Sequence, residues 1–259
     1  MQDYWLKQTN KPLFPELEWS RPENKLQAGK LLIIGGNAAG FALPAESYTA
    51  ATKAGVGSVR VLLPESLRRS MGKLFPEAEF APSTPSGSFA NQALAELLGA
   101  SIWADGVLLP GDISRNSETT VLFESFLEKY QGQVTLTKDT TDIFCDQPIA
   151  LLHRSDTLLV LAMGQLRRLG SAARFPRAFT SDMGLVQLVE ALHEFMKRFP
   201  LYIITRHQDH YVVAVNGRVS TTSLKDEQPV WRTTIAGKAS VWWLQNPTKP
   251  FEALTTVVF

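Results

Sequence analysis

The feature that most constrains the fold is a series of short, apolar segments that alternate with segments of helical pattern. The first apolar segment, Lys30–Ile34, ends in Gly35 and Gly36, and a second, residues 58–63, follows an alanine-rich helix predicted at residues 45–54. A short segment that is apolar throughout is typical of a strand buried on both faces of a parallel sheet. A strand, a helix and a second strand over this length form a right-handed crossover unit.

The same alternation continues to the end of the chain. The further predicted strands are Gly106–Leu109, 133–136, Thr157–Leu161 and 201–205, and the further predicted helices are 91–98, 117–130, Leu185–Arg198, 236–245 and 250–259. Two extended runs, residues 211–215 and 218–222, flank Asn216 and Gly217, a pair that favours a hairpin. The sequence therefore predicts an α/β fold of three layers, with a mostly parallel central sheet and an antiparallel hairpin at its C-terminal edge.

The N-terminal 29 residues show no helical or strand period and contain three prolines, so we expect an arm over a single domain at 30–259. The net charge of +1 creates no field that would collect nucleic acid or anionic lipid. No apolar run approaches the ~20 residues that cross a bilayer, and the polar start does not resemble a signal peptide. The single cysteine, Cys145, favours packing over chemistry. We expect a cytoplasmic protein.

Two segments carry a resemblance to a known family. Residues 30–65, KLLIIGGNAAGFALPAESYTAATKAGVGSVRVLLPE, resemble the opening of the NAD(P)H-hydrate dehydratases: a strand into Gly-Gly, an alanine-rich helix, Gly-x-Gly, and a strand ending in Pro-Glu. Residues 106–119, GVLLPGDISRNSET, resemble the family's strand into Gly-Pro-Gly-Leu-Gly before a helix. Pro110, Gly111 and Arg115 keep that frame with one residue inserted. The resemblance covers about residues 25–259.

The resemblance implies a ribokinase-like fold and a repair reaction, in which ATP or ADP drives dehydration of hydrated nicotinamide cofactors. It also implies a homo-oligomer, an NAD(P)H-like ligand, and no metal except Mg²⁺ brought by the nucleotide. Glycines at strand ends let phosphates approach backbone N–H groups. The predicted crevice residues are Gly35, Gly36, Asn37, Pro110, Gly111, Thr234, Ala236, Gly237 and Lys238.

The sequence departs from the family at the acid/base position. The family has Gly-Ser/Thr-Gly-Asp there, whereas residues 233–240 read TTIAGKAS, which puts Lys238 in place of the Asp. A lysine near its usual pKa of ~10.4 is protonated at pH 7 and accepts no proton. Asp139 and Asp112 are the weak candidates for a replacement acid. Arg232 and Lys238 flank a helix start predicted near Ala236, where they favour a bound phosphate.

Four further departures fall on loops expected to face the ligand. They are Ala162 and Gln165 in place of His and Glu, Thr137 before Asp139 in place of the first of two acids, Thr205-Arg206 in place of Lys-Gly, and Ala42 in place of Gly. We therefore predict a non-catalytic or repurposed homologue that binds a nucleotide-like ligand. The alternatives are an active dehydratase and a regulatory module that docks a partner through Trp231, Trp242 and Trp243.

Two other groups of residues are weighed for function. His207, Asp209 and His210 contain metal-ligand types, but a strand would point them to different sides, which favours a solvated hairpin start over a metal site. Arg167 and Arg168 form a basic pair that is expected to lie on a solvated face. A nucleic-acid site would need a longer patch with interleaved aromatic residues.

Overall fold

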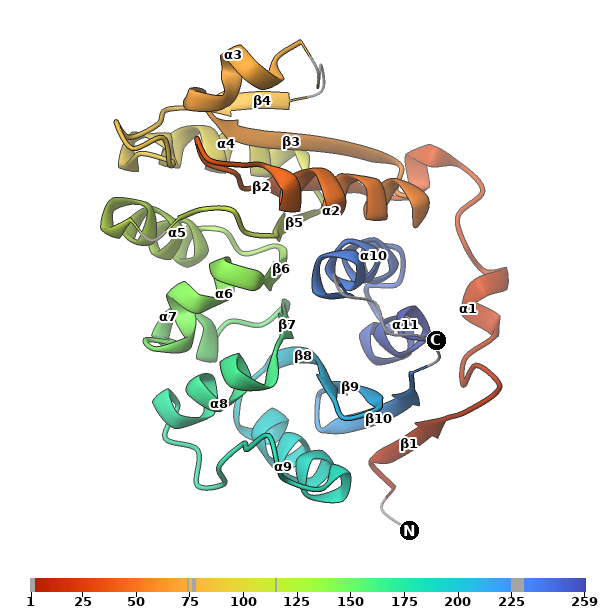
Figure 1. The fold of residues 1–259 in the computed structure, drawn as a ribbon. Helices are drawn as coiled ribbons and strands as arrows, with labels where there is room; N and C mark the ends of the chain where they lie inside the picture. The colour runs from red at the N-terminus through yellow and green to blue at the C-terminus, as the bar shows by residue number, and fades with distance from the viewer. Residues whose placement is uncertain (1–2, 74, 76–77, 115, 225–230) are drawn as a thin grey trace.

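The computed structural model describes residues 3–73, 75, 78–114, 116–224 and 231–259, and they form one ten-stranded sheet flanked by helices (Figure 1). The strands are β1 (Trp5–Gln8), β2 (Lys30–Ile34), β3 (Ser58–Pro64), β4 (Ala78–Ala81), β5 (Gly106–Leu109), β6 (Gln133–Thr137), β7 (Thr157–Leu161), β8 (Leu201–His207), β9 (His210–Val215) and β10 (Arg218–Ser223). Their order across the sheet is β1-β10-β9-β8-β7-β6-β5-β2-β3-β4.

The helices lie on both faces of this sheet. They are α1 (Glu16–Trp19), α2 (Ala42–Lys53), α3 (Arg68–Met71), α4 (Leu94–Trp103), α5 (Ser117–Lys129), α6 (Lys138–Cys145), α7 (Ile149–Leu152), α8 (Met163–Ala172), α9 (Leu185–Arg198), α10 (Trp231–Gln245) and α11 (Pro250–Val257), with short 3-10 turns at Lys25–Gln27, Glu65–Leu67 and Asn91–Ala93. No helix among the described residues combines the length and apolar character needed to span a membrane.

Strand pairing confirms the predicted fold class. In the sheet order, all neighbouring strands between β8 and β4, which include β2 and β3, pair in parallel. For example, Ile33 of β2 lies between Val61 of β3 and Leu108 of β5. The antiparallel pairs β8–β9 and β9–β10 form the predicted C-terminal hairpin edge. Asn216 and Gly217 both adopt positive φ in the turn, as a tight hairpin requires.

The two faces of the sheet bury separate cores because strand side chains alternate. On β2, Leu32 and Ile34 pack into the core beneath α4, α5, α8 and α9, whereas Leu31 and Ile33 pack into the core beneath α2, α10 and α11. Figure 1 shows these two helical layers on opposite sides of the strands. This alternation explains why the buried strands are apolar throughout.

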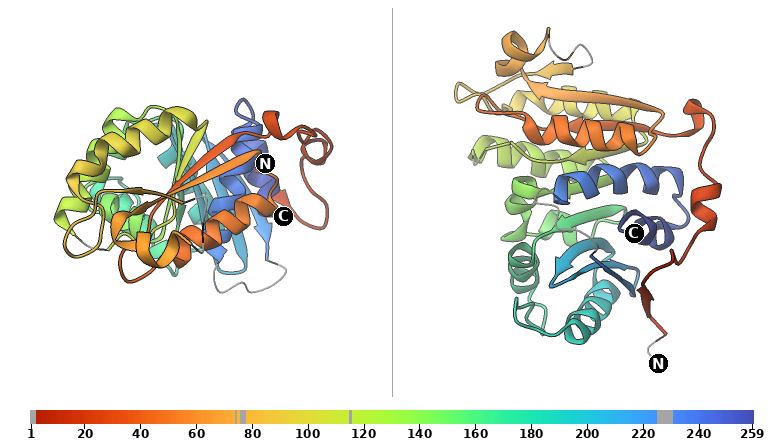
Figure 2. Two further views of the ribbon diagram at one scale, coloured as in Figure 1. Left: turned by 90° about the horizontal axis from the view of Figure 1, so that it is seen from above. Right: turned by 45° about the vertical axis from the view of Figure 1, so that its right-hand side comes forward.

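The expectation of an arm without regular structure was wrong for part of the N-terminal segment. Residues 5–8 form β1, which pairs in parallel with β10 and extends the sheet. The Trp5 indole donates to Thr221 Oγ1 at 3.0 Å, and the buried Gln8 amide donates to Thr222 Oγ1 at 3.1 Å. The chain then runs along the outside of α10 and α11 before entering β2 (Figure 2). Strand β1 has only four residues, WLKQ, and they do not alternate between apolar and polar. The sequence therefore carried too little periodicity to predict this strand.

Several shorter elements were missed, and one helix begins earlier than predicted. Strand β4 and helices α6, α7 and α8 are each ten residues or fewer, so their periodicity is weak. Helix α10 extends back to Trp231, not to the neighbourhood of Ala236. Ala236 and Gly237, which were expected at the helix start, lie within the helix. This difference moves Lys238 away from the helix N-terminus.

Candidate functional site

The loops that leave β2 and β5 meet at the carboxyl end of the sheet through their backbones. Gly36 N donates to Gly111 O at 3.2 Å, and the Asn37 side chain donates to Asp112 O at 2.5 Å. A Cβ on Gly35 would lie 2.6 Å from Gly111 O. Gly111 has φ +120°, and a Cβ there would lie 2.1 Å from Asp139 Oδ1. The structure thus brings together the predicted residues of these two loops, and it requires glycine for close backbone packing.

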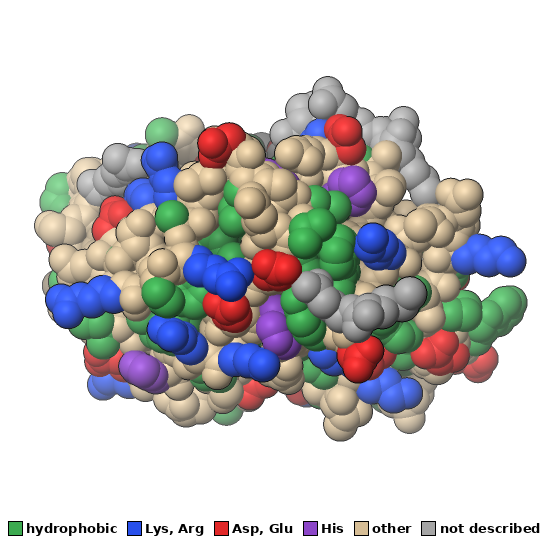
Figure 3. Space-filling model, turned by 90° about the horizontal axis from the view of Figure 1, so that it is seen from below, with side chains coloured by type: hydrophobic (Ala, Val, Ile, Leu, Met, Phe, Trp, Pro, Cys, Tyr) green, Lys and Arg blue, Asp and Glu red, His purple; other side chains and the backbone are tan. Residues whose placement is uncertain are grey.

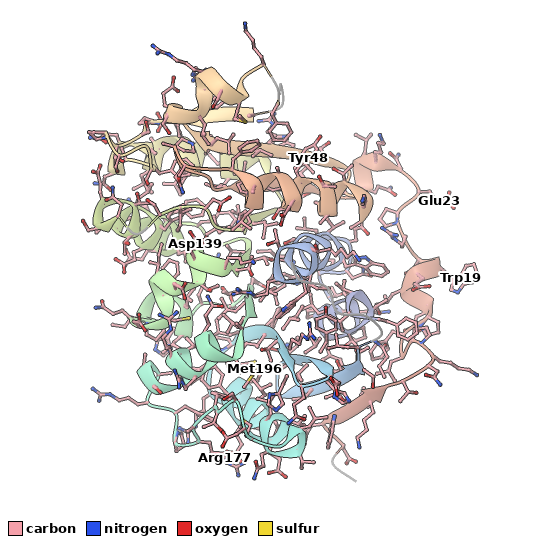
Figure 4. All side chains as sticks on the ribbon, viewed as in Figure 1. Trp19, Glu23, Tyr48, Asp139, Arg177 and Met196 are labelled. Carbon is pink, nitrogen blue, oxygen red and sulfur yellow. The ribbon has the colours of Figure 1, made fainter. Side chains whose placement is uncertain are left out.

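Both candidate acids, Asp112 and Asp139, accept hydrogen bonds from this backbone. Asp139 Oδ1 and Oδ2 accept from the amides of Asp112 and Ile113, each at 2.9 Å. Asp112 Oδ2 accepts from Leu43 N at 2.8 Å, at the start of α2. Burial raises the pKa of Asp139, while the amides of Ile113 and Asp112 oppose that shift. Figure 4 marks Asp139 at the start of α6, at the centre of this end of the sheet.

A pocket of about 520 Å³ opens beside Asp139, and basic side chains dominate its wall. The lining residues are Leu43, Lys138, Asp139, Asp142, Ala162, Gly164, Gln165, Arg167, Arg168 and Arg232. They come from α2, from the β6–α6 and β7–α8 junctions, and from the start of α10. Four of these side chains are cationic and two are acidic, which leaves an excess of positive charge. Arg167 is exposed, as expected for a solvated face, whereas Arg168 is half-buried, and both line this open pocket.

The side chain of Gln165 connects three helices at the floor of this pocket. Its Nε2 donates to Lys138 O at 2.7 Å, to Thr141 Oγ1 at 2.6 Å and to Asp142 Oδ1 at 3.0 Å. Its Oε1 accepts from Ala162 N at 3.1 Å and from Arg232 Nη1 at 2.8 Å. Gln165 therefore fixes α6, α8 and α10 relative to one another, and it holds the Arg232 guanidinium at the pocket.

Two half-buried cations in the pocket, Lys138 and Arg232, keep donors free for a ligand, as does the exposed Arg167. Among the described residues, the Lys138 ammonium has no hydrogen bond or ion pair, and the Arg232 guanidinium donates only to Gln165. Burial, and next the charge of Arg232, lower the pKa of Lys138, while Glu46 and Asp139 act in the opposite direction. Arg168, in contrast, is paired with Asp142 and with Asp146 Oδ2 at 3.1 Å. Lys138 and Arg232 are therefore the groups best placed to bind an anion.

The residues predicted on α10 lie elsewhere. Gly237 packs against α2, where an added Cβ would lie 2.8 Å from Ala50 Cβ and 3.0 Å from Ser47 O. Ala236 is buried, whereas Thr234 and Lys238 line a separate groove of about 360 Å³ between α10 and α2. Lys238 is the eighth residue of α10, so the predicted anion site of Arg232 and Lys238 at a helix start does not form. Only Arg232 reaches the pocket.

Two of the positions that depart from the family pattern have a structural role. Thr137 Oγ1 donates to Val160 O at 2.9 Å, and Thr205 Oγ1 donates to Leu161 O at 3.0 Å. Both hydroxyls are buried at the carboxyl ends of their strands and join them to β7. Threonine at these positions stabilises the sheet and offers no free group to a ligand.

The tryptophan surface proposed for partner docking is not formed by the predicted residues. Trp243 is 1% exposed and stacks edge-on with Tyr202, and Trp242 is covered by Arg21 of the N-terminal segment. The exposed tryptophan is Trp19 on α1, which points away from the body of the protein (Figure 4). The expectation of an exposed Trp242 or Trp243 was wrong, because the helix faces that carry these two residues are covered by Arg21 and by Tyr202 of the sheet.

The remaining predicted groups gather no site among the described residues. His207 Nε2 contacts Met183 O at 2.7 Å, and no set of three His, Cys, Asp or Glu side chains in the described ranges is arranged to hold a metal. Cys145 is buried, and burial raises its pKa to about 12. Arg115 lies outside the described residues. On the face shown in Figure 3, acidic and basic side chains are interspersed and form no large field of one sign.

The pocket residues were only partly recognisable from the sequence. Arg232 was identified as an anion ligand, and Gln165 was identified only as a departure from a family motif. Lys138 was not identified. The signal that was available is the spacing of Gln165 and Arg168, three residues apart after the buried strand β7, because this spacing puts both on one face of a helix.

Comparison with known proteins gives a likeness of structure alone. No family model and no curated protein matches the chain. A ribokinase-like superfamily protein from Enterococcus faecalis is 15% identical with a TM-score of 0.75, over 97% of this chain and 84% of that one. Protein SMU.573 from Streptococcus mutans is 17% identical with a TM-score of 0.72, over 92% and 83%.

A third solved structure bears on the expected family. The ADP/ATP-dependent NAD(P)H-hydrate dehydratase from Bacillus subtilis, co-crystallised with ATP and Mg²⁺, is 13% identical with a TM-score of 0.66, over 96% of this chain and 87% of that one. Identities in this range establish a shared fold and leave function open. The strand order, the antiparallel edge and these neighbours together show that the chain has the ribokinase-like fold.

Proposed function

We propose that this protein binds a phosphate-bearing, nucleotide-like ligand in the pocket between α6, α8 and α10. The observation that carries the proposal is the convergence of Lys138, Arg167, Arg168 and Arg232 on one pocket at the carboxyl ends of β6 and β7. In open α/β sheets, ligands bind at this end of the strands. Guanidinium groups bind phosphate through charge-assisted hydrogen bonds.

The first turn of α8 adds to this positive character. Ala162 and Gly164 line the pocket at the start of α8, and a Cβ on Gly164 would meet no atom within 4 Å. Backbone N–H groups at a helix N-terminus attract anions, and glycine leaves them open to approach. The ten residues of α8 therefore point their positive end toward the same space as the four basic side chains.

The same geometry favours binding over the dehydratase chemistry of the expected family. Lys238, at the position of the family acid, lines the groove between α10 and α2 and does not reach the pocket. Asp139 and Asp112 both hold backbone amides in place. We therefore propose a non-catalytic or repurposed ligand-binding protein of the ribokinase-like fold.

Asp139 supports an active dehydratase as the second candidate. An acid whose pKa is raised by burial beside a ligand pocket is what general acid/base catalysis requires. The test is turnover of hydrated NADH or NADPH with ATP or ADP. Turnover by the wild-type chain that is lost in Asp139→Asn would establish this candidate, and absence of turnover in a chain that binds ADP would support binding without dehydration.

The primary test is thermal unfolding with and without AMP, ADP, ATP and NADPH at millimolar concentration. A ligand at 100 times its Kd adds ~2.7 kcal/mol to the free energy of unfolding, which raises the Tm of a chain of this size by roughly 5–10 °C. The Arg232→Gln variant is expected to lose the shift. Lys129→Gln, an exposed lysine at the end of α5, is the matched control for loss of one charge. The proposal fails if no ligand shifts the Tm of the wild-type chain.

A further inference from the structure

Magnesium accompanies ATP in the solved dehydratase that shares this fold, so the pocket can be tested for a place to hold that ion. Mg²⁺ binds through water, substrate phosphate and one or two carboxylates, in octahedral geometry. The acidic side chains around the basic pocket are Asp139 and Asp142 in its lining, Asp112 next to Asp139 and Asp146 on Arg168, with Glu46 in the neighbouring groove. A magnesium site here would need carboxylate oxygens of this group.

The chain itself engages these four aspartates, Asp146 through its ion pair with Arg168. Asp139 accepts two backbone amides through its two oxygens, and Asp112 accepts the first-turn amide of α2. Asp142 Oδ1 accepts from Gln165 and from the Arg168 guanidinium. Asp142, which is paired with Arg168, has little negative charge to offer a second cation, and the carboxylates of Asp112 and Asp139 hold backbone amides. Within the part of the chain that the structure describes, no three His, Cys, Asp or Glu side chains are arranged to hold a metal ion. This donor set does not fit magnesium.

The charges around the pocket lead to the same conclusion. Burial, and next the charge of Arg232, lower the pKa of Lys138, even with Glu46 and Asp139 nearby. A divalent cation at this place would meet the same charge of Arg232 and also the charges of Arg167 and Arg168. The guanidinium of Arg232, fixed by Gln165, lies where a ligand phosphate would otherwise need a metal to neutralise it.

From this disagreement we infer that the pocket binds its phosphate ligand as the free anion and not as the magnesium complex, with Arg232 and Lys138 neutralising the phosphate. The inference rests on the proposed function and specifies the ionic form of its ligand. Since Mg²⁺ and the pocket then compete for the same phosphate oxygens, added magnesium weakens binding. The neutral amide of Gln165 is required for this mode of binding, because a carboxylate at position 165 would form an ion pair with Arg232 and neutralise it.

The test is calorimetric titration of the full chain with ADP, first in EDTA and then with excess MgCl₂, at matched ionic strength. We expect the Kd to be weaker by about tenfold with magnesium, as expected for losing one charge-assisted hydrogen bond. Equal or tighter binding with magnesium overturns the inference and leaves the proposed function standing. Binding in neither condition overturns the proposed function as well.

A pair of variants separates the role of Gln165 from a general effect on folding. Gln165→Glu preserves the shape of the side chain but puts a carboxylate against Arg232 and Asp142, so ADP binding in EDTA should weaken and the penalty from magnesium should shrink toward none. Gln187 is the matched control, because its Oε1 accepts from Gly184 N at the start of α9 as that of Gln165 accepts from Ala162 N. Gln187→Glu should leave both Kd values unchanged. An unchanged magnesium penalty in Gln165→Glu, in a folded protein, contradicts the assigned role.

Discussion

A buried arginine, Arg154, and a half-buried one, Arg232, show how the same side chain takes a structural or a binding role. Arg154, between α7 and β7, directs all of its donors to the chain itself. Its acceptors are the carbonyls of Tyr130, Gly132, Ser155 and Asp156 and the hydroxyl of Thr157. Arg232 donates only to Gln165 among the described residues. Burial lowers the pKa of both.

The difference lies in the donors that remain. A guanidinium carries five N–H donors in a fixed plane, and buried donors need acceptors. Arg154 meets that need within the fold, so it stabilises the loops around β6 and β7. Arg232 has an acceptor within the described part of the fold for only one of its donors and lies at an open pocket. Its other donors are therefore available to a ligand. Unused hydrogen-bonding capacity at a pocket is therefore a better guide to function here than burial or charge alone.

The largest expected effect comes from removing the structural arginine. Arg154→Met keeps the length and apolar stem of the side chain but leaves four carbonyls without their donor. We expect the free energy of unfolding to fall by about 3–5 kcal/mol, measured by urea denaturation. A loss below about 1 kcal/mol would mean that water replaces the guanidinium without cost.

The second largest effect is expected at Gly111, which separates backbone packing from pocket chemistry. Gly111→Ala adds a Cβ that would lie 2.1 Å from Asp139 Oδ1 and 2.8 Å from Leu43 Cδ1, at φ +120°. We expect a loss of about 3 kcal/mol, read as a lower Tm. Gly99→Ala is the control, since that exposed glycine of α4 has no atom within 4 Å of an added Cβ, and it should gain about 0.5–1 kcal/mol. Equal Tm changes would refute the packing argument.

The matching change at the pocket arginine is expected to leave stability nearly intact. Arg232→Met should change the free energy of unfolding by less than about 1 kcal/mol, because only one hydrogen bond is lost, while the Kd for ADP should rise by roughly 10–100-fold. Denaturation and calorimetry on the same preparation measure the two quantities. A destabilisation as large as that of Arg154→Met would show that the comparison between the two arginines is false.

The smallest expected effect is a pH dependence carried by Asp139. Burial raises its folded-state pKa above the unfolded value of about 3.9. The folded state therefore binds the proton more tightly, and stability falls as the pH rises from the unfolded pKa through the folded pKa. Asp139→Asn does not titrate, so the wild-type chain should lose stability relative to this variant as the pH rises from about 4 to 7. A difference between the two that is constant over this range would contradict the shift.

The sequence was sufficient for the fold where the burial pattern is strong. Buried strands such as Lys30–Ile34 and Thr157–Leu161 are apolar throughout, and the Asn216-Gly217 turn specifies its hairpin locally. The edge strand β1 was missed because one of its faces is not covered and its residues do not alternate. The start of α10 was missed because residues 231–234, WRTT, are aromatic, charged or β-branched and show no helical apolar period.

In the candidate site, too, one part was predictable from the sequence and another was not. The β2 and β5 loops were predictable because their geometry requires glycine at Gly35, Gly36 and Gly111, and glycine is visible in a sequence. The basic pocket was not predictable, since its side chains lie up to 94 residues apart, from Lys138 to Arg232, and only the folded sheet brings them together. Gln165 connects the two residues by donating to the Lys138 carbonyl and accepting from Arg232, and no local sequence pattern marks it.

The pairing of β1 with β10 has a consequence for synthesis of the protein. Residues 5–8 contact a strand made more than two hundred residues later, and Gln8 also donates to Thr255 O at 3.1 Å, four residues from the end of the chain. On the ribosome the sheet can assemble from β2 onward while its first strand waits without a partner. Contacts between such distant segments are the slowest to form. Closure of this edge therefore has to wait for β10, and Trp5 and Leu6 lack their strand partner until that segment has emerged.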